Sequence, residues 1–171
     1  MKKLMIIPAI AMAMTAGSAV ASQQSEVKFF GNVTAQTCDV IAEVNGSVSN
    51  TIQLGTVSTG GAGKEIPLVF KAKNAQGDDC SSLTGKTATV SWSGALGNEG
   101  IDNQSGTATG AYVLLSSANA NNDSNINKTN NSVQFDATKV IGDGLQFKAQ
   151  LKGGSVAGDY QSAAAYAVTY Q

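Results

Sequence analysis

The chain of 171 residues contains no histidine and no arginine, and it has only two cysteines. Histidine is the side chain that most often serves as a general base, and a free cysteine is a common nucleophile. Nucleic-acid-binding surfaces need clustered arginine and lysine to neutralise phosphates. The residue content therefore speaks against catalysis and against nucleic-acid binding, and we expect no cofactor.

The twelve carboxylates are scattered through the turns of the chain, and the neighbours Asp78 and Asp79 would point in opposite directions in an extended chain. A carboxylate-only mechanism needs two acids held close together. The run Asn121, Asp123, Asn125 faintly resembles a calcium-binding loop, but it has no glycine at the sharp turn and Ser132 stands where the bidentate glutamate belongs. Neither a catalytic site nor a metal site is predicted.

Only the beginning of the chain is continuously apolar. Two lysines precede an apolar run that ends in Ala19-Val20-Ala21. This order is typical of a secretory signal peptide cleaved between Ala21 and Ser22, with a membrane anchor as the alternative. We therefore expect residues 1–21 to be removed and the remainder to be exported.

Both cysteines, Cys38 and Cys80, lie in the part that we expect to be exported. An even number of cysteines in an oxidising compartment favours a disulfide. Two free thiols or half of a metal site are the alternatives, although the chain offers no histidine and no further cysteine to complete such a site.

Apolar and polar residues alternate in most of the chain, and no segment has a convincing helical period. Trp92 shares a face with Ala88 and Val90, which favours a core position over stacking on a sugar. The alternating segments are 26–35, 50–57, 65–73, 86–94, 111–117, 132–137, 145–153 and 163–171. About eight short strands, joined by turn-forming residues, predict a β-sandwich. The Asn-rich stretch 119–132 is expected to be a solvated loop.

The C-terminal strand carries the most informative pattern. Gly158 begins the last 14 residues, and Tyr170 is the penultimate residue of an alternating apolar strand. Three further stretches accompany them in order: VKFFGNVTAQTC at 27–38, IQLGTV at 52–57 and LQFKAQLKGG at 145–154. Together these features resemble the pilins of enterobacterial chaperone–usher fimbriae, in particular the major subunits of the type 1-related group.

The resemblance implies an all-β, incomplete immunoglobulin-like β-sandwich that lacks its last strand. It divides the chain into a signal peptide (1–21), an N-terminal donor-strand segment (22–35) and a pilin domain (36–171). In this family a strand of a periplasmic chaperone first fills the groove beside the terminal strand. At the outer-membrane usher, the donor segment of the next subunit replaces it, which is a form of β-augmentation.

The same resemblance implies which residues take part. The donor strand would present Ser25, Val27, Phe29, Gly31 and Val33. The strand that lines the groove and meets the chaperone would present Gly158, Ala164, Tyr166, Val168 and Tyr170. Family donor strands usually carry glycine at the position of Ser25, so that either the pocket is roomier here or exchange is slower.

The implied function is that of a structural fimbrial shaft subunit, exported through the periplasm to the cell surface, that supports bacterial adhesion. Its partners would be identical or related pilin subunits, the chaperone and the usher, with a host-cell receptor as a further candidate. A minor or adhesive subunit that binds host glycans is one alternative, and a secreted soluble β-sandwich is another. The terminal strand could also pair with the N-terminal strand of its own chain.

Overall fold

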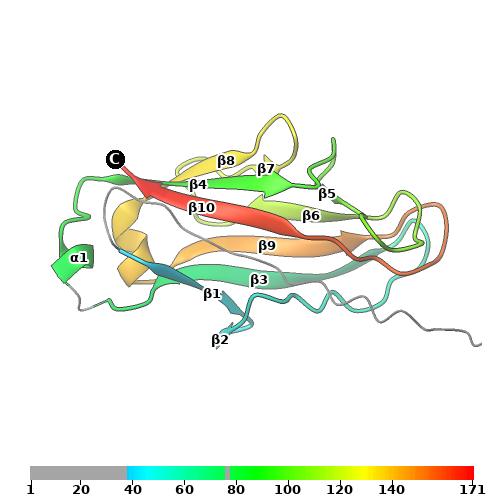
Figure 1. Cartoon of the computed structure of the whole chain (residues 1–171), viewed down its shortest axis with the longest axis horizontal. Helices are drawn as coiled ribbons and strands as arrows, with labels where there is room; N and C mark the ends of the chain where they lie inside the picture. The colour runs from blue at the N-terminus through cyan, green and yellow to red at the C-terminus, as the bar shows by residue number, and fades with distance from the viewer. Residues whose placement is uncertain (1–37, 76–77) are drawn as a thin grey trace, which may run out of the picture.

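The computed structural model describes residues 38–75 and 78–171, which form two antiparallel β-sheets packed face to face (Figure 1). The larger sheet has seven strands in the order β2-β1-β3-β9-β6-β5, with β7 also paired to β6, and the smaller has the order β10-β4-β8. The strands are β1 Val40–Val44, β2 Ser47–Val48, β3 Ala62–Ala72, β4 Thr87–Gly94, β5 Ile101–Asp102, β6 Tyr112–Ser117, β7 Asn125–Ile126, β8 Ser132–Asp136, β9 Leu145–Lys152 and β10 Ala164–Tyr170. The prediction of an all-β sandwich is confirmed.

Two short helices lie at the same end of the sandwich as the C-terminus (Figure 1). They are α1 Asp78–Ser81 and the 3-10 helix η1 Ala137–Ile141. Neither has an apolar period in the sequence, and neither was predicted. η1 begins after Asp136, whose side chain accepts a hydrogen bond from the backbone of Thr138 at 2.9 Å and thereby caps the helix.

Six of the predicted segments form strands with the expected buried face. They are 65–73, 86–94, 111–117, 132–137, 145–153 and 163–171, which correspond to β3, β4, β6, β8, β9 and β10. Trp92 is 5% exposed, so that its predicted core position is confirmed. The segment 26–35 lies outside the described residues.

The prediction of a strand at 50–57 is wrong. Ile52 and Leu54 are half-buried and Gln53 is exposed, as the alternation requires, but the segment belongs to neither sheet. Gly55 has a φ of 74°, in the left-handed region, which interrupts a pleated strand. The alternation in this segment therefore arises because one face is buried, although the segment forms no ladder of hydrogen bonds with another strand.

The Asn-rich stretch 119–132 is not a simple solvated loop. It contains β7, which pairs with β6, and Ile126 is fully buried. The Asn119 side chain donates to the carbonyl of Gly144 and accepts from the backbone nitrogen of Gln146, both at 2.9 Å. The Asn119 side chain thus takes the place of a backbone hydrogen-bonding partner for Gly144 and Gln146, and it holds the stretch against β9.

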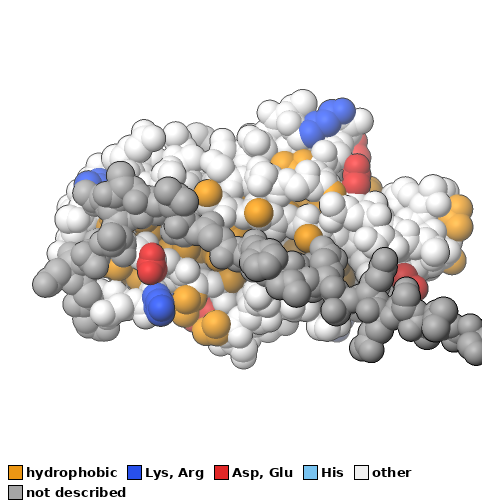
Figure 2. Space-filling model, viewed as in Figure 1, with side chains coloured by type: hydrophobic (Ala, Val, Ile, Leu, Met, Phe, Trp, Pro, Cys, Tyr) orange, Lys and Arg blue, Asp and Glu red, His pale blue; other side chains and the backbone are white. Residues whose placement is uncertain are grey.

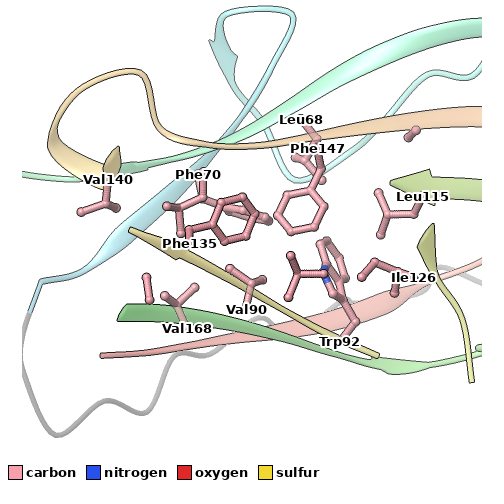
Figure 3. Packing of buried hydrophobic residues seen from close by; sticks show 14 of the residues in the cluster. Leu68, Phe70, Val90, Trp92, Leu115, Ile126, Phe135, Val140, Phe147 and Val168 are labelled. Carbon is pink, nitrogen blue, oxygen red and sulfur yellow. The ribbon is translucent and has the colours of Figure 1, made fainter. Parts of the chain in front are cut away.

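Aromatic side chains fill the core between the two sheets (Figure 3). Phe70, Phe135 and Phe147 are at most 1% exposed. The rings of Trp92 and Phe147 meet edge to face, with centroids 5.4 Å apart, which is a favourable arrangement for two aromatic quadrupoles. The packing of β3, β4 and β9 on each other fixes the position of the sheet edges.

The predicted disulfide is confirmed. Cys38 and Cys80 are bonded, with their Cα atoms 4.8 Å apart, and both side chains are buried. The bond ties the start of β1 to α1.

Candidate functional site: a groove between the sheet edges

The C-terminal strand β10 forms one wall of the candidate site. Among the strands that the structure describes, it pairs with β4 and lies at the edge of the three-stranded sheet. Val168 and Tyr170 are buried, whereas Ala164 and Tyr166 are half-buried. The apolar residues of β10 therefore face the larger sheet in one row.

The other wall consists of β1 and the segment 49–54 that follows the β1–β2 hairpin. Between this wall and β10 lies an elongated opening, which we call the sheet-edge groove, with a cavity of about 150 Å³. Its sides are lined by Ala42, Ile52 and Leu54 on one side and by Tyr160, Ala164 and Tyr166 on the other. Hydrophobic side chains are visible at several places on this face, and charged ones are few (Figure 2). The groove is thus suited to an apolar guest.

The floor of the groove is aromatic. Phe70 and Trp92 line the cavity, and their ring centroids lie 5.8 Å apart. The ring of Tyr166 lies over Phe70 at 4.3 Å, so that β10 contributes to the floor as well as to the wall. A floor of this kind offers a large apolar contact area and specific ring geometry to a side chain that enters.

Two tyrosine hydroxyls hold the C-terminal part of the chain near the two ends of the groove, and only one of these bonds joins the β10 side to the β1 side. Tyr170 donates to the carbonyl of Cys38 at 3.1 Å, and Tyr160 donates to the carbonyl of Ile101 at 2.9 Å. The Tyr160 bond reaches β5 of the larger sheet, and the Tyr170 bond reaches the segment that leads into β1. Burial raises the pKa of both Tyr160 and Tyr170 to about 12.

The raised pKa values predict unfolding in alkali. In the unfolded chain the phenols ionise near pH 10, but in the folded protein they stay neutral to about pH 12. As the pH rises, the unfolded state therefore releases these protons first, and stability that is complete below pH 10 is lost towards pH 12. Melting temperature and phenolate absorbance followed over this range test the prediction. Tyr160→Phe and Tyr170→Phe should each remove part of the late-titrating absorbance; titration of all the phenols near pH 10 in the folded protein would contradict it.

Gly158 lies in the exposed loop before β10, not on the strand. A Cβ atom at this position would collide with Oγ1 of Thr107 and would lie 2.6 Å from the backbone nitrogen of Ala108. Glycine is therefore required by the close approach of two loops. The neighbouring loop is held there by Asn103, whose Oδ1 accepts from the backbone nitrogen of Gln161 at 2.9 Å.

Substitution of Gly158 by alanine should displace the loop that leads into β10. Since one of the obstructing atoms belongs to the backbone, a side-chain rotation cannot relieve the collision, and we expect a loss of about 1–3 kcal/mol in the free energy of unfolding. Denaturant unfolding measures it. Ala157→Ser, at the exposed neighbouring position, should be close to neutral. Equal stability of Gly158→Ala and wild type would show that the loops can separate freely.

The candidate residues named from the sequence do not all meet in one place. Ala164 and Tyr166 line the cavity, Val168 and Tyr170 continue the same wall towards the C-terminus, and Gly158 supports the loop before it. The donor-strand residues and the cleavage position lie outside the described residues; they are Ala21, Ser22, Ser25, Val27, Phe29, Gly31 and Val33. The lining residues Ile52, Leu54 and Tyr160 were missed as groove residues, although the alternation at 52–57 marked two of them as facing the core.

Within 38–75 and 78–171, no group of three or more His, Cys, Asp or Glu side chains could hold a metal ion. In the same ranges no helix is long and apolar enough to cross a membrane. The ion pairs Lys71–Glu43 (3.4 Å) and Lys148–Glu65 (3.0 Å) lie at the surface, although the Glu43 side chain is half-buried, and surface pairs contribute little to stability.

No protein-family model matches the chain. The F107 fimbrial protein of Escherichia coli is 49% identical to it over 172 aligned positions, which cover the full length of both. The chain belongs to the fimbrial subunits of the chaperone–usher type. The K99 fimbrial protein of Escherichia coli is 33% identical to this fimbrial subunit over 159 positions, 84% of the subunit and 85% of the relative.

The fold of the fimbrial subunit is also that of a solved pilin. The P pilus rod subunit PapA superposes on it with a TM-score of 0.52, covering 86% of the subunit and 100% of PapA. At 20% identity this likeness shows the fold alone.

Proposed function

We propose that this fimbrial subunit polymerises by donor-strand exchange and builds the shaft of a fimbria that supports adhesion. The N-terminal segment of one subunit fills the sheet-edge groove of the next. Before that, a strand of a periplasmic chaperone occupies the groove. The exchange of the two strands takes place at the outer-membrane usher, through which the subunits reach the cell surface. The observation that carries the proposal is the aromatic-floored groove between β10 and β1.

The donor segment matches the groove in chemistry. Val27, Phe29 and Val33 alternate with polar residues, apart from Phe30. Full burial of three such side chains gives about 5–9 kcal/mol before ordering costs, at about 1.5–3 kcal/mol each. Whole-domain stability is only about 5–15 kcal/mol. The donor strand therefore supplies a large share of the stability of the assembled subunit.

The ends of the groove determine the direction of the donor. At the Tyr170 end, the hydroxyl bond to Cys38 joins the two walls. The body of the donating subunit follows its own residue 37, so it leaves where the groove opens, beyond Tyr160. The donor then runs antiparallel to β10, the more stable pairing. Each contact joins two different surfaces and leaves one of each exposed, which generates a filament.

In this direction Ser25 faces the Tyr170 end of the groove. Val168 and Tyr170 are 0% and 6% exposed and do not line the cavity, so there is little room for an extra side chain. We expect a donor peptide with Ser25→Gly to be captured several-fold faster than the natural sequence, because a shallow site favours glycine. Stopped-flow mixing measures the rate, with Ser22→Gly as the control. Slower capture of Ser25→Gly would show that the hydroxymethyl group is accommodated.

The direct test mixes the purified chaperone-bound subunit with a synthetic peptide of residues 22–35. We expect the chaperone to leave and a peptide–subunit complex to form, as seen by gel filtration and native mass spectrometry. Retention of the chaperone at saturating peptide would rule out donor-strand exchange by this segment.

A further inference from the structure

The sheet-edge groove continues beyond Tyr160 into a second cavity of about 650 Å³. Ile52, Leu54 and Tyr160 line both cavities, so that the two adjoin each other. Away from these three residues the lining is mixed. It includes the polar side chains of Gln53, Thr56, Asp159 and Gln161, several glycines and alanines, and the apolar side chains of Val57, Leu151 and Val156. No Lys or Arg lines it in the described part of the chain.

The walls of this second cavity are held by backbone hydrogen bonds. The nitrogen of Gly60 donates to the carbonyl of Gly154 at 3.0 Å, and the nitrogen of Gly153 donates to the carbonyl of Gly61 at 2.8 Å. Asn103 fixes the opposite side through the backbone of Gln161. A guest therefore meets a preformed site and does not have to order both loops, which favours binding.

The sequence after the donor strand has the matching character. Val33 is the last apolar donor residue, and Thr34-Ala35-Gln36-Thr37 connects it to Cys38. These four residues span at most about 13–14 Å when extended. They are small, uncharged and rich in hydrogen-bonding groups, and the second cavity offers them the polar side chains of Gln53, Asp159 and Gln161.

We propose that the second cavity is the seat for residues 34–37 of the neighbouring subunit in the fibre. The inference rests on the proposed donor-strand exchange and on the antiparallel direction argued above. The apolar part of the donor lies in the apolar groove, and the polar connection to the neighbour lies in the second cavity, against its polar side chains. Hydroxyl and amide groups of residues 34, 36 and 37 hydrogen-bond to Gln53, Gln161 and the Asp159 carboxylate. The joint between two subunits thus includes the connecting segment as well as the inserted strand.

The test compares two donor peptides, residues 22–33 and residues 22–37, both with amidated C-termini so that the end charge is equal. Each is exchanged into the chaperone-held mature subunit, and its dissociation in guanidinium is followed by fluorescence anisotropy. We expect the longer peptide to dissociate about tenfold more slowly, which corresponds to about 1.4 kcal/mol. A third peptide with four glycines at 34–37 should behave like the short one.

A pair of variants locates the effect. Thr56→Tyr places a large ring in the second cavity and should remove the difference between the two peptides, without changing dissociation of the short one. Thr84→Tyr, the same change at an exposed threonine that follows α1 and does not line the second cavity, should leave the difference intact.

The outcomes separate this inference from the proposed function. If both peptides are captured and dissociate equally, or if Thr56→Tyr leaves the difference unchanged, the second cavity is not the seat, and donor-strand exchange stands. If neither peptide displaces the chaperone, donor-strand exchange itself fails, and the inference fails with it.

Discussion

Deletion of residues 22–33 from the mature chain will abolish fibre growth and leave the subunit able to capture a donor peptide. The deletion removes the apolar donor residues but touches neither β10 nor the segment 49–54 that line the groove. Such a subunit can accept a strand from another chain but cannot give one, so that it ends a filament. Electron microscopy and size-exclusion chromatography measure the loss as complete absence of long polymers.

Matched variants within the same segment test whether polymerisation depends on specific side chains of the donor or only on the length of the segment. Replacement of the proposed donor residues Val27, Phe29 and Val33 by serine should abolish polymerisation, because donor-strand exchange would draw the bulk of its free energy from the burial of these side chains. Replacement of the residues between them, Lys28, Phe30 and Asn32, by serine should have a small effect on polymerisation, because neighbouring side chains of a strand point to opposite faces. Long fibres from the truncated subunit, or equal losses from both triple variants, would show that the donor assignment is wrong. A bare fibre that persists after deletion of the whole gene would instead indicate a minor subunit.

The strands of the fold could be predicted where one face is buried and a ladder forms. β3, β4 and β9 show the two-residue period because each packs one row of side chains into the shared core. The same period at 50–57 gave the wrong prediction, since a buried face does not require a hydrogen-bonded partner. The positive φ at Gly55, which a sequence pattern does not reveal, decides against a strand there.

The groove was only half predictable, because its two walls are far apart in the sequence. The periodicity of β10 identifies one wall and its inward row. The opposite wall and floor come from Ala42, Ile52, Phe70 and Ile101, which the sheet topology brings together and no local pattern connects. Tyr160 belongs to the site because its hydroxyl reaches Ile101, 59 positions away in the chain. Long-range pairing of this kind follows from tertiary packing.

Gly158 illustrates the difference between noticing a residue and explaining it. Only a resemblance to known pilins implies a role for this residue at the level of the sequence. The physical reason is the contact with the loop at Thr107 and Ala108, where a Cβ atom has no space. Ala108 and Gly158 also line the second cavity. Gly158 therefore affects both the position of β10 and the shape of the second cavity.

Loss of the disulfide should destabilise this subunit strongly. Cys38 and Cys80 are 42 positions apart, and closing a loop of this length stabilises a fold by about 4 kcal/mol in the chain-entropy model. We expect the double variant Cys38→Ala/Cys80→Ala, measured as its complex with donor peptide 22–35, to lose about that amount in guanidinium unfolding. Compared with a domain stability of about 5–15 kcal/mol, the loss is enough to impair folding before a chaperone can bind.

Reduction of the wild-type complex separates the cross-link from the packing of the two sulfur atoms. Both cysteines are buried, so that alanine also removes apolar contacts, whereas reduction keeps the side chains and breaks only the bond. A reduced wild type nearly as unstable as the double variant would attribute the loss to the cross-link. Because Cys38 also accepts the hydrogen bond of Tyr170, loosening it should widen the groove at that end and speed release of the peptide. A loss below about 1 kcal/mol with unchanged release, well under the chain-entropy expectation, would show that the hydrogen-bonded frame holds the wall without the bond.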